Sequence, residues 1–420
     1  MTDASLKFLP DLVEEHFEEL AFLWGQRRGA LRSPRFMPRD LARLEKRIEA
    51  HLQGLLIAGD ELDAFVRPGL EGDDADAAFA AGFGLLRSRI PGSVDRVWEA
   101  FASVSGPRAD GLAEAFAHGP ADALLSRLQQ AVTAAPPMRS VAAAEALALR
   151  GRLAPDSRAQ EAWLASDEPV VRRRAWRVVS LAALPQSRAL WERGLSDPDA
   201  WVRAAAREAA LWCRQTWALE DVRRGRRGAG GADADSMYLV AATGDAADLE
   251  RVLAWVKDVG SGPERYRVLG VLGHPAGVET LLHAMGGLDL AASAFAGQAF
   301  TKITGEDVDS GRRTVVPPAD GKEPDAFEAE FLDEMPLPDE RKARAAWEKR
   351  RPDAARGTRW CRGHDVSRGP SPDALAVLDR ESLWEARLRG TLDGSWKGRP
   401  PDLEVFPQGA ASHSAVREPY

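Results

Sequence analysis

Apolar residues near the start of the chain recur at the three- and four-residue spacing of a helix. Two such stretches occupy residues 9–24 and 41–55. Between them, the segment LRSPRFMPRD holds two prolines, which end one helix and begin the next. The polar positions of the second stretch, RLEKRIEAH, alternate in charge, as is typical of a solvated helix face. The pattern predicts a helical N-terminal region over residues 1–90.

Between residues 94 and 305, blocks rich in Ala, Leu and Trp alternate with short breaks rich in Gly, Pro, Asp and Ser. The breaks read SGPRADG, HGPAD, AAPP, GRLAPDS, SDEP, LPQS, SDPD, GSGPE and GHPAG. No strand-like alternation is sustained between them. Because helices this short cannot bury their apolar faces alone, they must stack on their neighbours. We expect an array of short helices over residues 91–305.

Two stretches of the array align as copies, SDEPVVRRRAWRVVSLAAL from residue 166 and SDPDAWVRAAAREAALW from residue 196. Ser or Asp caps each helix by accepting from backbone N–H groups, and Pro fits the first turn because its missing N–H would be unpaired there. Val and Ala form the buried stripe, and the Arg of each copy is placed to reach the Asp of a neighbouring unit. The predicted structural repeat positions are Asp167, Val171 and Ala175 in the first copy and Asp197, Val202 and Ala206 in the second.

The character of the chain changes after residue 305, because twelve of its 27 prolines lie in the last 116 residues. This density excludes long helices except at PDERKARAAWEKRRP and PDALAVLDRESLWEARLRG. We therefore predict an irregular Pro-rich C-terminal region over residues 306–420, packed across or beside the array.

The spacing of Asp, Val-Arg and Ala in the two copies resembles that of the HEAT family, and residues 263–305, ending in AFAGQAFTKITGED, resemble a terminal pair of such repeats. The chain also resembles an uncharacterised bacterial family of about this length through HFEELAFLWGQRRGALRSP, AFAGQAFTKITGED and LPLPDERKARAAWEKRR followed by GTRWCRGH. The resemblance implies an all-α fold, an α-solenoid of HEAT-like helical hairpins. It also implies that the gene lies near genes for type VI secretion components. It identifies no catalytic residues.

Composition and charge argue against several classes of function. The formal net charge of −8 argues against a protein that wraps nucleic acid with its whole surface. The N-terminus carries acidic residues where a secretory signal would carry basic and apolar ones, and no run reaches the roughly 18 apolar residues of a membrane span. Cys213 and Cys361 lie far apart and form no disulfide framework. We expect a cytoplasmic protein with no membrane partner.

Motifs for catalysis or metal binding are missing from the sequence. Cys361 and His364 have half of a zinc-site spacing, but no second CxxC or HxxxH pair completes four ligands. There is no GxSxG elbow, no Walker loop and no dinucleotide fingerprint. We expect no catalytic, cofactor-binding or metal-binding residues. The alternative is a lyase-type enzyme that uses a groove between helices, because some bacterial HEAT-like repeats occur in bilin lyases; this rests on analogy alone.

Tryptophans concentrate in the array, where they can either seal the gaps between helices or anchor a partner. Their helical spacing with Ala, Leu and Val favours core packing for Trp163, Trp176, Trp191, Trp212, Trp217 and Trp255. Trp201, beside a helix cap, is the expected exception. We predict it as a partner-binding residue together with Arg172 and Arg203.

A basic run, Arg223, Arg224, Arg226 and Arg227, interrupts the array within RRGRRGAGG. It lacks interleaved aromatic residues, which favours a solvated loop over a nucleic-acid site. The sequence as a whole favours a binding protein over an enzyme: a scaffold, adaptor or chaperone-like accessory whose partner is another protein, such as a secretion-system component or effector.

Overall fold

The computed structural model describes residues 9–103, 106–154, 156–224, 234–316, 332, 334–355 and 357–407. Helices account for most of these residues, which confirms the predicted predominance of helix. The chain divides into two compact units. Unit 1 comprises residues 1–213 and 399–420, and unit 2 comprises residues 214–398. The boundary at residue 213 falls inside the predicted array, and the division at residues 90 and 305 stays a prediction.

The N-terminal part of unit 1 is the predicted helical pair. Helix α1 (Pro10–Ala30) packs on α2 (Pro38–Leu56), and both begin at a proline. Their buried stripes include Leu20, Leu23, Ile48 and Leu52, all fully buried. The break between the two helices is the Pro-containing segment predicted from the sequence.

Ten further helices of unit 1 form five consecutive hairpins, in which each odd-numbered helix packs on the even-numbered helix that follows it. The hairpins consist of α3 (Leu62–Glu71) and α4 (Ala75–Arg87), α5 (Ser93–Ala102) and α6 (Pro107–His118), α7 (Leu125–Ala134) and α8 (Pro137–Leu149), α9 (Ser157–Leu164) and α10 (Pro169–Leu181), and α11 (Arg188–Leu195) and α12 (Ala200–Trp212).

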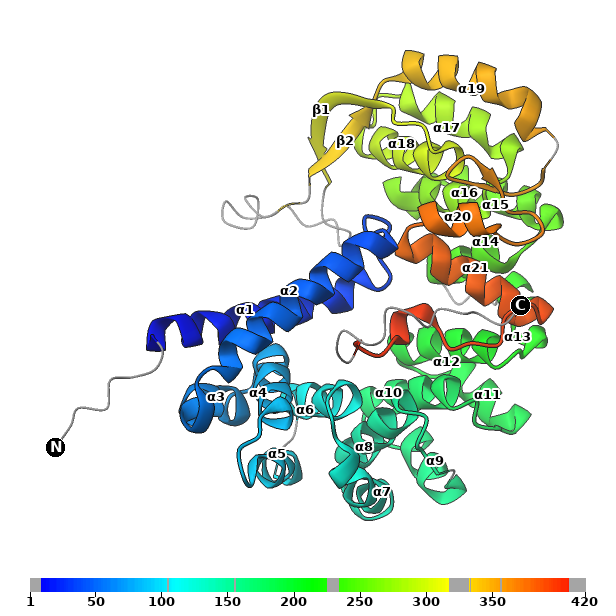
Figure 1. Ribbon diagram of the computed structural model, residues 1–420. Helices are drawn as coiled ribbons and strands as arrows, with labels where there is room; N and C mark the ends of the chain where they lie inside the picture. Colours follow the sequence, from blue (N-terminus) through cyan, green and yellow to red (C-terminus); the bar gives the residue numbers. More distant parts are fainter. Residues whose placement is uncertain are drawn as a thin grey trace. The chain divides into compact units, whose positions relative to one another are not determined.

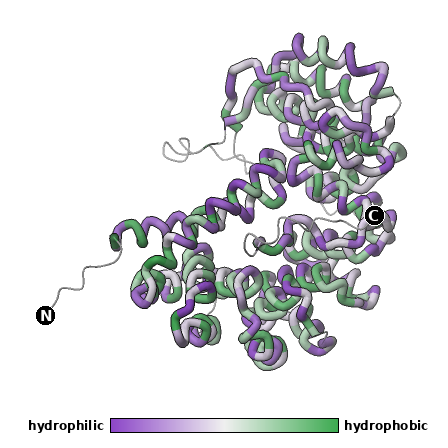
Figure 2. The backbone as a smooth tube through the Cα atoms, viewed as in Figure 1, coloured by the Kyte–Doolittle hydropathy of each residue, from purple (hydrophilic) through white to green (hydrophobic). Residues whose placement is uncertain are grey.

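The even-numbered helices α4, α6, α8, α10 and α12 pack on one another in sequence and make up what we call the inner row. Figure 1 shows α5, α7 and α9 beside this row as a second layer. The helices of the inner row bury Ala-rich stripes, and small Ala side chains allow the close approach of neighbours. Figure 2 shows the matching alternation of hydrophilic and hydrophobic residues along these helices.

The predicted breaks coincide with the observed turns at eight of the nine sites. SGPRADG is the exception, since α6 begins at Pro107 and takes in five of its seven residues. Proline is pre-organised for the first turn of a helix, so this residue starts the helix that it was expected to interrupt.

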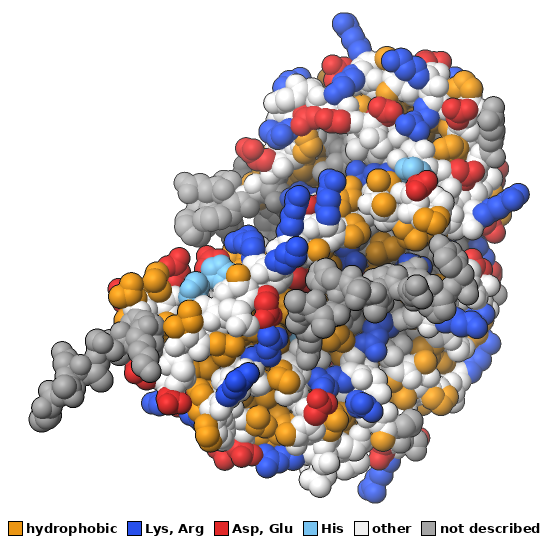
Figure 3. Space-filling model, in the orientation of Figure 1, with side chains coloured by type: hydrophobic (Ala, Val, Ile, Leu, Met, Phe, Trp, Pro, Cys, Tyr) orange, Lys and Arg blue, Asp and Glu red, His pale blue; other side chains and the backbone are white. Residues whose placement is uncertain are grey.

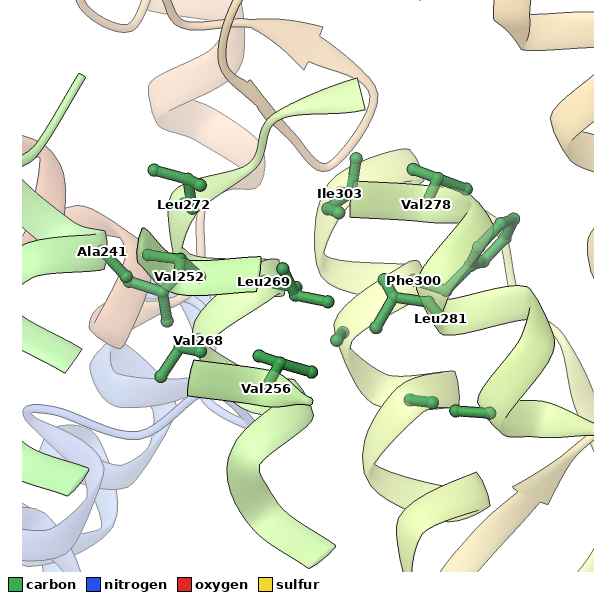
Figure 4. Close-up of a cluster of buried hydrophobic side chains, with 14 of the residues drawn as sticks. Ala241, Val252, Val256, Val268, Leu269, Leu272, Val278, Leu281, Phe300 and Ile303 are labelled. Carbon is green, nitrogen blue, oxygen red and sulfur yellow. The ribbon is translucent and has the colours of Figure 1, made fainter. Parts of the chain in front are cut away.

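Unit 2 contains six consecutive helices from the second half of the predicted array. They are α13 (Thr216–Arg224), α14 (Ala234–Thr243), α15 (Leu249–Val256), α16 (Arg267–Leu272), α17 (Val278–Met285) and α18 (Leu290–Thr304). Their shared core brings together Ala241, Val252, Leu269, Leu281 and Phe300, one from each of α14 to α18 (Figure 4).

The region after residue 305 is more regular than predicted. It holds the two expected helical stretches as α19 (Glu340–Ala354) and as α20 (Pro372–Val377) with α21 (Arg380–Asp393). It also holds two antiparallel two-stranded sheets, β1 (Asp309–Val315) with β2 (Glu334–Pro338), and β3 (Trp360–Cys361) with β4 (His364–Asp365). Prolines 336 and 338 fit β2 because both strands of such a ribbon are edge strands.

Gly305, the glycine of the ITG sequence, joins the array to this region. It ends α18 in the left-handed conformation, with φ +74°. A Cβ atom there would lie 2.7 Å from the carbonyl oxygen of Arg362, so glycine also permits the close approach of the β3–β4 turn. In that turn, Arg362 and Gly363 both have positive φ, as in a type I′ hairpin.

Candidate protein-binding surfaces

Trp201 lies at the start of α12 and is 68% exposed, whereas Trp163, Trp176, Trp191 and Trp212 are buried. Trp217 and Trp255 are half-buried. The predicted core role of the buried four is confirmed, and so is the exposure of Trp201. A tryptophan that the helix start holds in solvent offers a large apolar surface to a partner.

The exposed tryptophan belongs to a row of equivalent positions. Met138, Val170 and Trp201 are each the second residue of an inner-row helix, in α8, α10 and α12. Met138 is half-buried and Val170 is 45% exposed. We call these three residues the apolar edge. Neighbouring helices of the inner row therefore present apolar side chains at the same end.

An ion pair between Arg172 and Asp197 links α10 to the loop between α11 and α12. The guanidinium donates from Nε and Nη2 to the two carboxylate oxygens, at 2.8 and 2.9 Å. It also donates to the backbone carbonyls of Ser166 and Asp167. Both side chains of the ion pair are largely buried, and Arg172 together with a backbone N–H outweighs burial and lowers the pKa of Asp197. The predicted reach of Arg to the Asp of a neighbouring unit is confirmed for Arg172.

Arg203 repeats the second part of this arrangement by donating to the carbonyls of Asp197 and Pro198, at 2.7 and 2.9 Å. These contacts make Asp197 the equivalent of Ser166, so the structural period is 31 residues. The sequence alignment pairs Arg172 with Arg203 at 31 residues and Asp167 with Asp197 at 30, a one-residue difference that lies in the turn. Arg172 and Arg203 thus both bind backbone at the start of their own helices, where they support the apolar edge.

The other repeat positions lie in the core: Val171, Ala175, Val202 and Ala206 are each fully buried. Asp199 caps α12 by accepting from the backbone N–H of Val202 at 2.9 Å. These contacts hold the helix start that carries Trp201.

A second surface of unit 1 was not predicted from the sequence. Four charged residues of the inner row, Glu114, Glu145, Arg177 and Glu208, follow one another at intervals of 31, 32 and 31 residues on α6, α8, α10 and α12. Arg177 forms an ion pair with Glu145 at 2.6 Å. The repeat spacing therefore extends to helices upstream of residue 160, and this spacing is the sequence signal that could have revealed the surface.

Other arginines complete this charged surface. Arg174 pairs with Glu145 and with Asp110, and Arg32 pairs with Glu208 at 2.8 Å. Burial raises the pKa of the Glu145 carboxyl, but Arg177 and Arg174 outweigh it, so the pKa is lowered. The surface is thus a network of paired charges, not a set of free catalytic carboxylates.

The chain itself covers part of the inner row. Residues 399–407, which we call the C-terminal segment, belong to unit 1 and contain one 3₁₀ turn, Pro401–Leu403. This segment appears in red in Figure 1. Arg399 donates to the carbonyl of Leu149 at the end of α8, and Asp402 interacts electrostatically with Arg177 and Glu208.

Phe406 anchors the C-terminal segment in an aromatic pocket. Its ring is 2% exposed and makes edge-to-face contacts with Trp24 and Phe83, at centroid distances of 6.1 and 5.8 Å. The guanidinium of Arg27 lies 5.6 Å from the ring centroid and donates to the carbonyl of Glu404. The backbone N–H of Phe406 donates to Nδ1 of His118 at 3.0 Å.

His118 accepts this hydrogen bond in its neutral form. Burial lowers the pKa of His118 well below 6.5, and the positive charges of Arg27, Arg177 and Arg150 lower it further. The pocket thus combines aromatic rings, a fixed acceptor and an arginine, and we call Trp24, Arg27, Phe83 and His118 the anchor pocket.

Unit 2 holds a buried charged cluster at the meeting of α18 and α21. Lys302 Nζ lies 2.8 Å from Glu381 Oε2 and 2.6 Å from Glu385 Oε1. Arg267 pairs with Glu381, and the hydroxyl of Tyr238 donates to Glu385. The neighbouring cavity, lined by residues including Glu385, has a volume of about 10 Å³, which suffices for one water molecule but not for a substrate.

Cys361 and His364 are cross-strand partners in the β3–β4 hairpin. Burial raises the pKa of the Cys361 thiol. Within the described part of the chain, no group of three or more His, Cys, Asp or Glu side chains is arranged to hold a metal ion.

The structure describes part of the basic run. Arg223 forms ion pairs with Asp248 at 2.7 Å and with Glu220 at 2.5 Å. Arg226 and Arg227 lie outside the described residues. On the visible face of the molecule, Lys and Arg side chains are mixed with Asp and Glu side chains (Figure 3).

Among the described helices, none is both long and apolar enough to cross a membrane. No protein-family model matches the chain, and a comparison with curated proteins finds no match.

Proposed function

We propose that the protein is a protein-binding scaffold of HEAT-like helical hairpins, an adaptor or chaperone-like accessory that binds its partner at the apolar edge. Trp201 carries this proposal, because it is a large apolar side chain exposed at a rigid helix start. Stacked hairpins that meet mainly their sequence neighbours are typical of α-solenoids, whose surfaces bind partners. The resemblance described above supports a type VI secretion component or effector as the partner.

The apolar edge can supply substantial binding energy. A tryptophan buries on the order of 200 Å² or more, so covering the exposed two thirds of Trp201 removes roughly 150 Å² from water. At about 25 cal/mol per Å², this contributes about 4 kcal/mol before the costs of association. Arg172 and Arg203 keep the helix starts fixed, which limits the ordering cost.

The test is co-purification with the products of neighbouring genes, followed by titration of the captured protein. Trp201→Ala is expected to weaken that complex at least tenfold, in line with the loss of an interface anchor. Leu288→Ala is the matched control, because Leu288 is fully exposed in unit 2. Equal affinity of the Trp201→Ala and wild-type proteins, or capture of none of the gene neighbours, would contradict the proposal.

The lyase alternative gains no support from the cavities described. One surface cavity, of about 670 Å³, lies beside the C-terminal segment, and another, of about 480 Å³, is lined by α19 and by Glu306 and Asp307. Their charged residues include ion-paired groups such as Arg150 with Asp122 and Arg350 with Glu306. The lyase alternative therefore stays a prediction.

A further inference from the structure

We propose that the groove filled by the C-terminal segment is a second binding site, which accepts an extended acidic segment of a partner protein with a phenylalanine for the anchor pocket. The chain's own segment occupies the groove until the partner displaces it. This surface is separate from the apolar edge, so the inference goes beyond the proposed function.

The contacts show how the groove recognises an extended chain. Arg27 donates to a backbone carbonyl of the segment, and His118 accepts from a backbone N–H. Any extended segment offers such backbone groups, so these two contacts are independent of its sequence. Specificity comes from the pocket around Phe406, since a buried aromatic side chain is the usual anchor of an interface.

The chain's own segment is an imperfect occupant. Asp402 Oδ1 is buried and has no hydrogen-bond partner among the described residues. Its negative charge is attracted by Arg177, but it also lies near the carboxyl of Glu208, whose pKa is raised by burial and further by Asp402. A buried oxygen without a partner and a like-charge neighbour both oppose docking. A partner without a carboxylate at this position avoids both costs.

The space beside the segment indicates the chemistry of the partner. A cavity of about 670 Å³ lies along Glu404 and Val405 of the segment. Outside the segment its charged lining residues are Arg152 and the ion pair of Arg150 with Asp122. An acidic side chain of a partner that enters this cavity can pair with Arg152, whereas a basic one would be repelled. The expected partner segment is therefore extended, aromatic at its anchor position, and acidic where it passes Arg152 but not at the position of Asp402.

The C-terminal segment has an advantage over a free peptide in binding the groove, because it is tethered to the same chain. A segment joined to the same chain has an effective concentration in the millimolar range, so it excludes a free peptide of similar intrinsic affinity. A change that weakens the tethered segment should therefore open the groove. Phe406→Ala empties the anchor pocket and leaves the pocket residues unchanged.

The probe is a fluorescent peptide with the sequence RPPDLEVFP, titrated into the full-length protein and followed by anisotropy. We expect Phe406→Ala to bind it at least tenfold more tightly than the wild type. Val405→Ala is the matched control, because Val405 lines the open cavity instead of the anchor pocket, and should behave as the wild type does. Replacing Phe by Ala in the peptide should reduce binding at least tenfold, and replacing its Asp by Asn should increase binding.

Leu403→Ser provides a second way to weaken the segment, since Leu403 is buried but lies outside the anchor pocket. It keeps the test valid if Phe406→Ala does not fold, as judged by circular dichroism. The proposal is overturned if neither folded variant binds the peptide more tightly than the wild type. It is also overturned if replacing the Phe of the peptide by Ala leaves the affinity unchanged. A wild-type dimer that exchanges C-terminal segments would also overturn it, because the occupant would then be a second copy. Trp201→Ala should leave peptide binding unchanged, which separates this result from the test of the apolar edge.

Discussion

Gly194→Ala offers a direct test of the stacking between neighbouring hairpins. Gly194 lies within α11, where alanine normally stabilises a helix by about 1 kcal/mol relative to glycine. Here a Cβ atom would lie 2.3 Å from Cζ2 and 2.6 Å from Cε2 of Trp176 in α10. The indole ring is buried and stacks on Trp191 at a centroid distance of 4.7 Å, so it has little room to move.

The two effects have opposite signs, and their sizes decide the outcome. Overpacking of a buried site costs about 1–3 kcal/mol, and contacts this short place the substitution near the upper end of that range. After the gain in helix propensity, the net destabilisation should be about 2 kcal/mol. For a unit of this size, such a change lowers the melting temperature by roughly 4–8 °C.

The assay is thermal and urea denaturation, compared with Gly29→Ala in α1. No atom lies within 4 Å of the Cβ position at Gly29, so that variant should be neutral or more stable than the wild type. Combining Gly194→Ala with Trp176→Phe removes the clashing part of the ring and should reduce the cost of the alanine. If Gly194→Ala is as stable as Gly29→Ala, then α10 and α11 do not pack as closely as described.

Three further predictions follow from buried charges. Asp197→Ala leaves Arg172 without its carboxylate and should destabilise unit 1 by about 3 kcal/mol in urea unfolding, whereas an unchanged midpoint would mean that the ion pair contributes nothing. Lys302→Met leaves two glutamates, including Glu381, without their shared cation and should cost about 3–5 kcal/mol, with the loss smaller at acidic pH, where carboxylates are protonated. Because burial lowers the pKa of His118 in the folded state, its contribution is complete above pH 6.5 and declines as the pH falls below that value; a His118→Gln variant should lack this part of the pH dependence of urea unfolding.

Local signals account for the parts of the fold that the sequence predicted. Prolines and capping Asp residues start helices within one or two residues, so α1, α2 and the helices around the aligned copies were accessible from short windows of sequence. The buried state of most tryptophans followed from their helical spacing. The β1–β2 ribbon was missed, because β2 is only five residues long and two of them are prolines, which argue against a strand.

The C-terminal segment could not be predicted for a different reason. Its anchor Phe406 meets His118, which lies 288 residues earlier in the sequence, and no local pattern reports such a contact. The charged surface beneath it could have been predicted from the sequence, because Glu114 and Glu145 continue the 31-residue spacing upstream. The predicted repeat rests on the two copies that begin at residues 166 and 196, so it does not reach these helices.

The apolar edge and the groove differ in how a partner would gain access to them. Trp201 is exposed, so its contribution to binding needs no rearrangement of the chain. The anchor pocket, in contrast, already holds Phe406, so a partner must first displace a tethered competitor. A partner that reaches both surfaces would bind the edge first, and the raised local concentration of its acidic segment would then favour exchange in the groove. This order predicts that Trp201→Ala slows displacement of the C-terminal segment by such a partner but not by the free peptide.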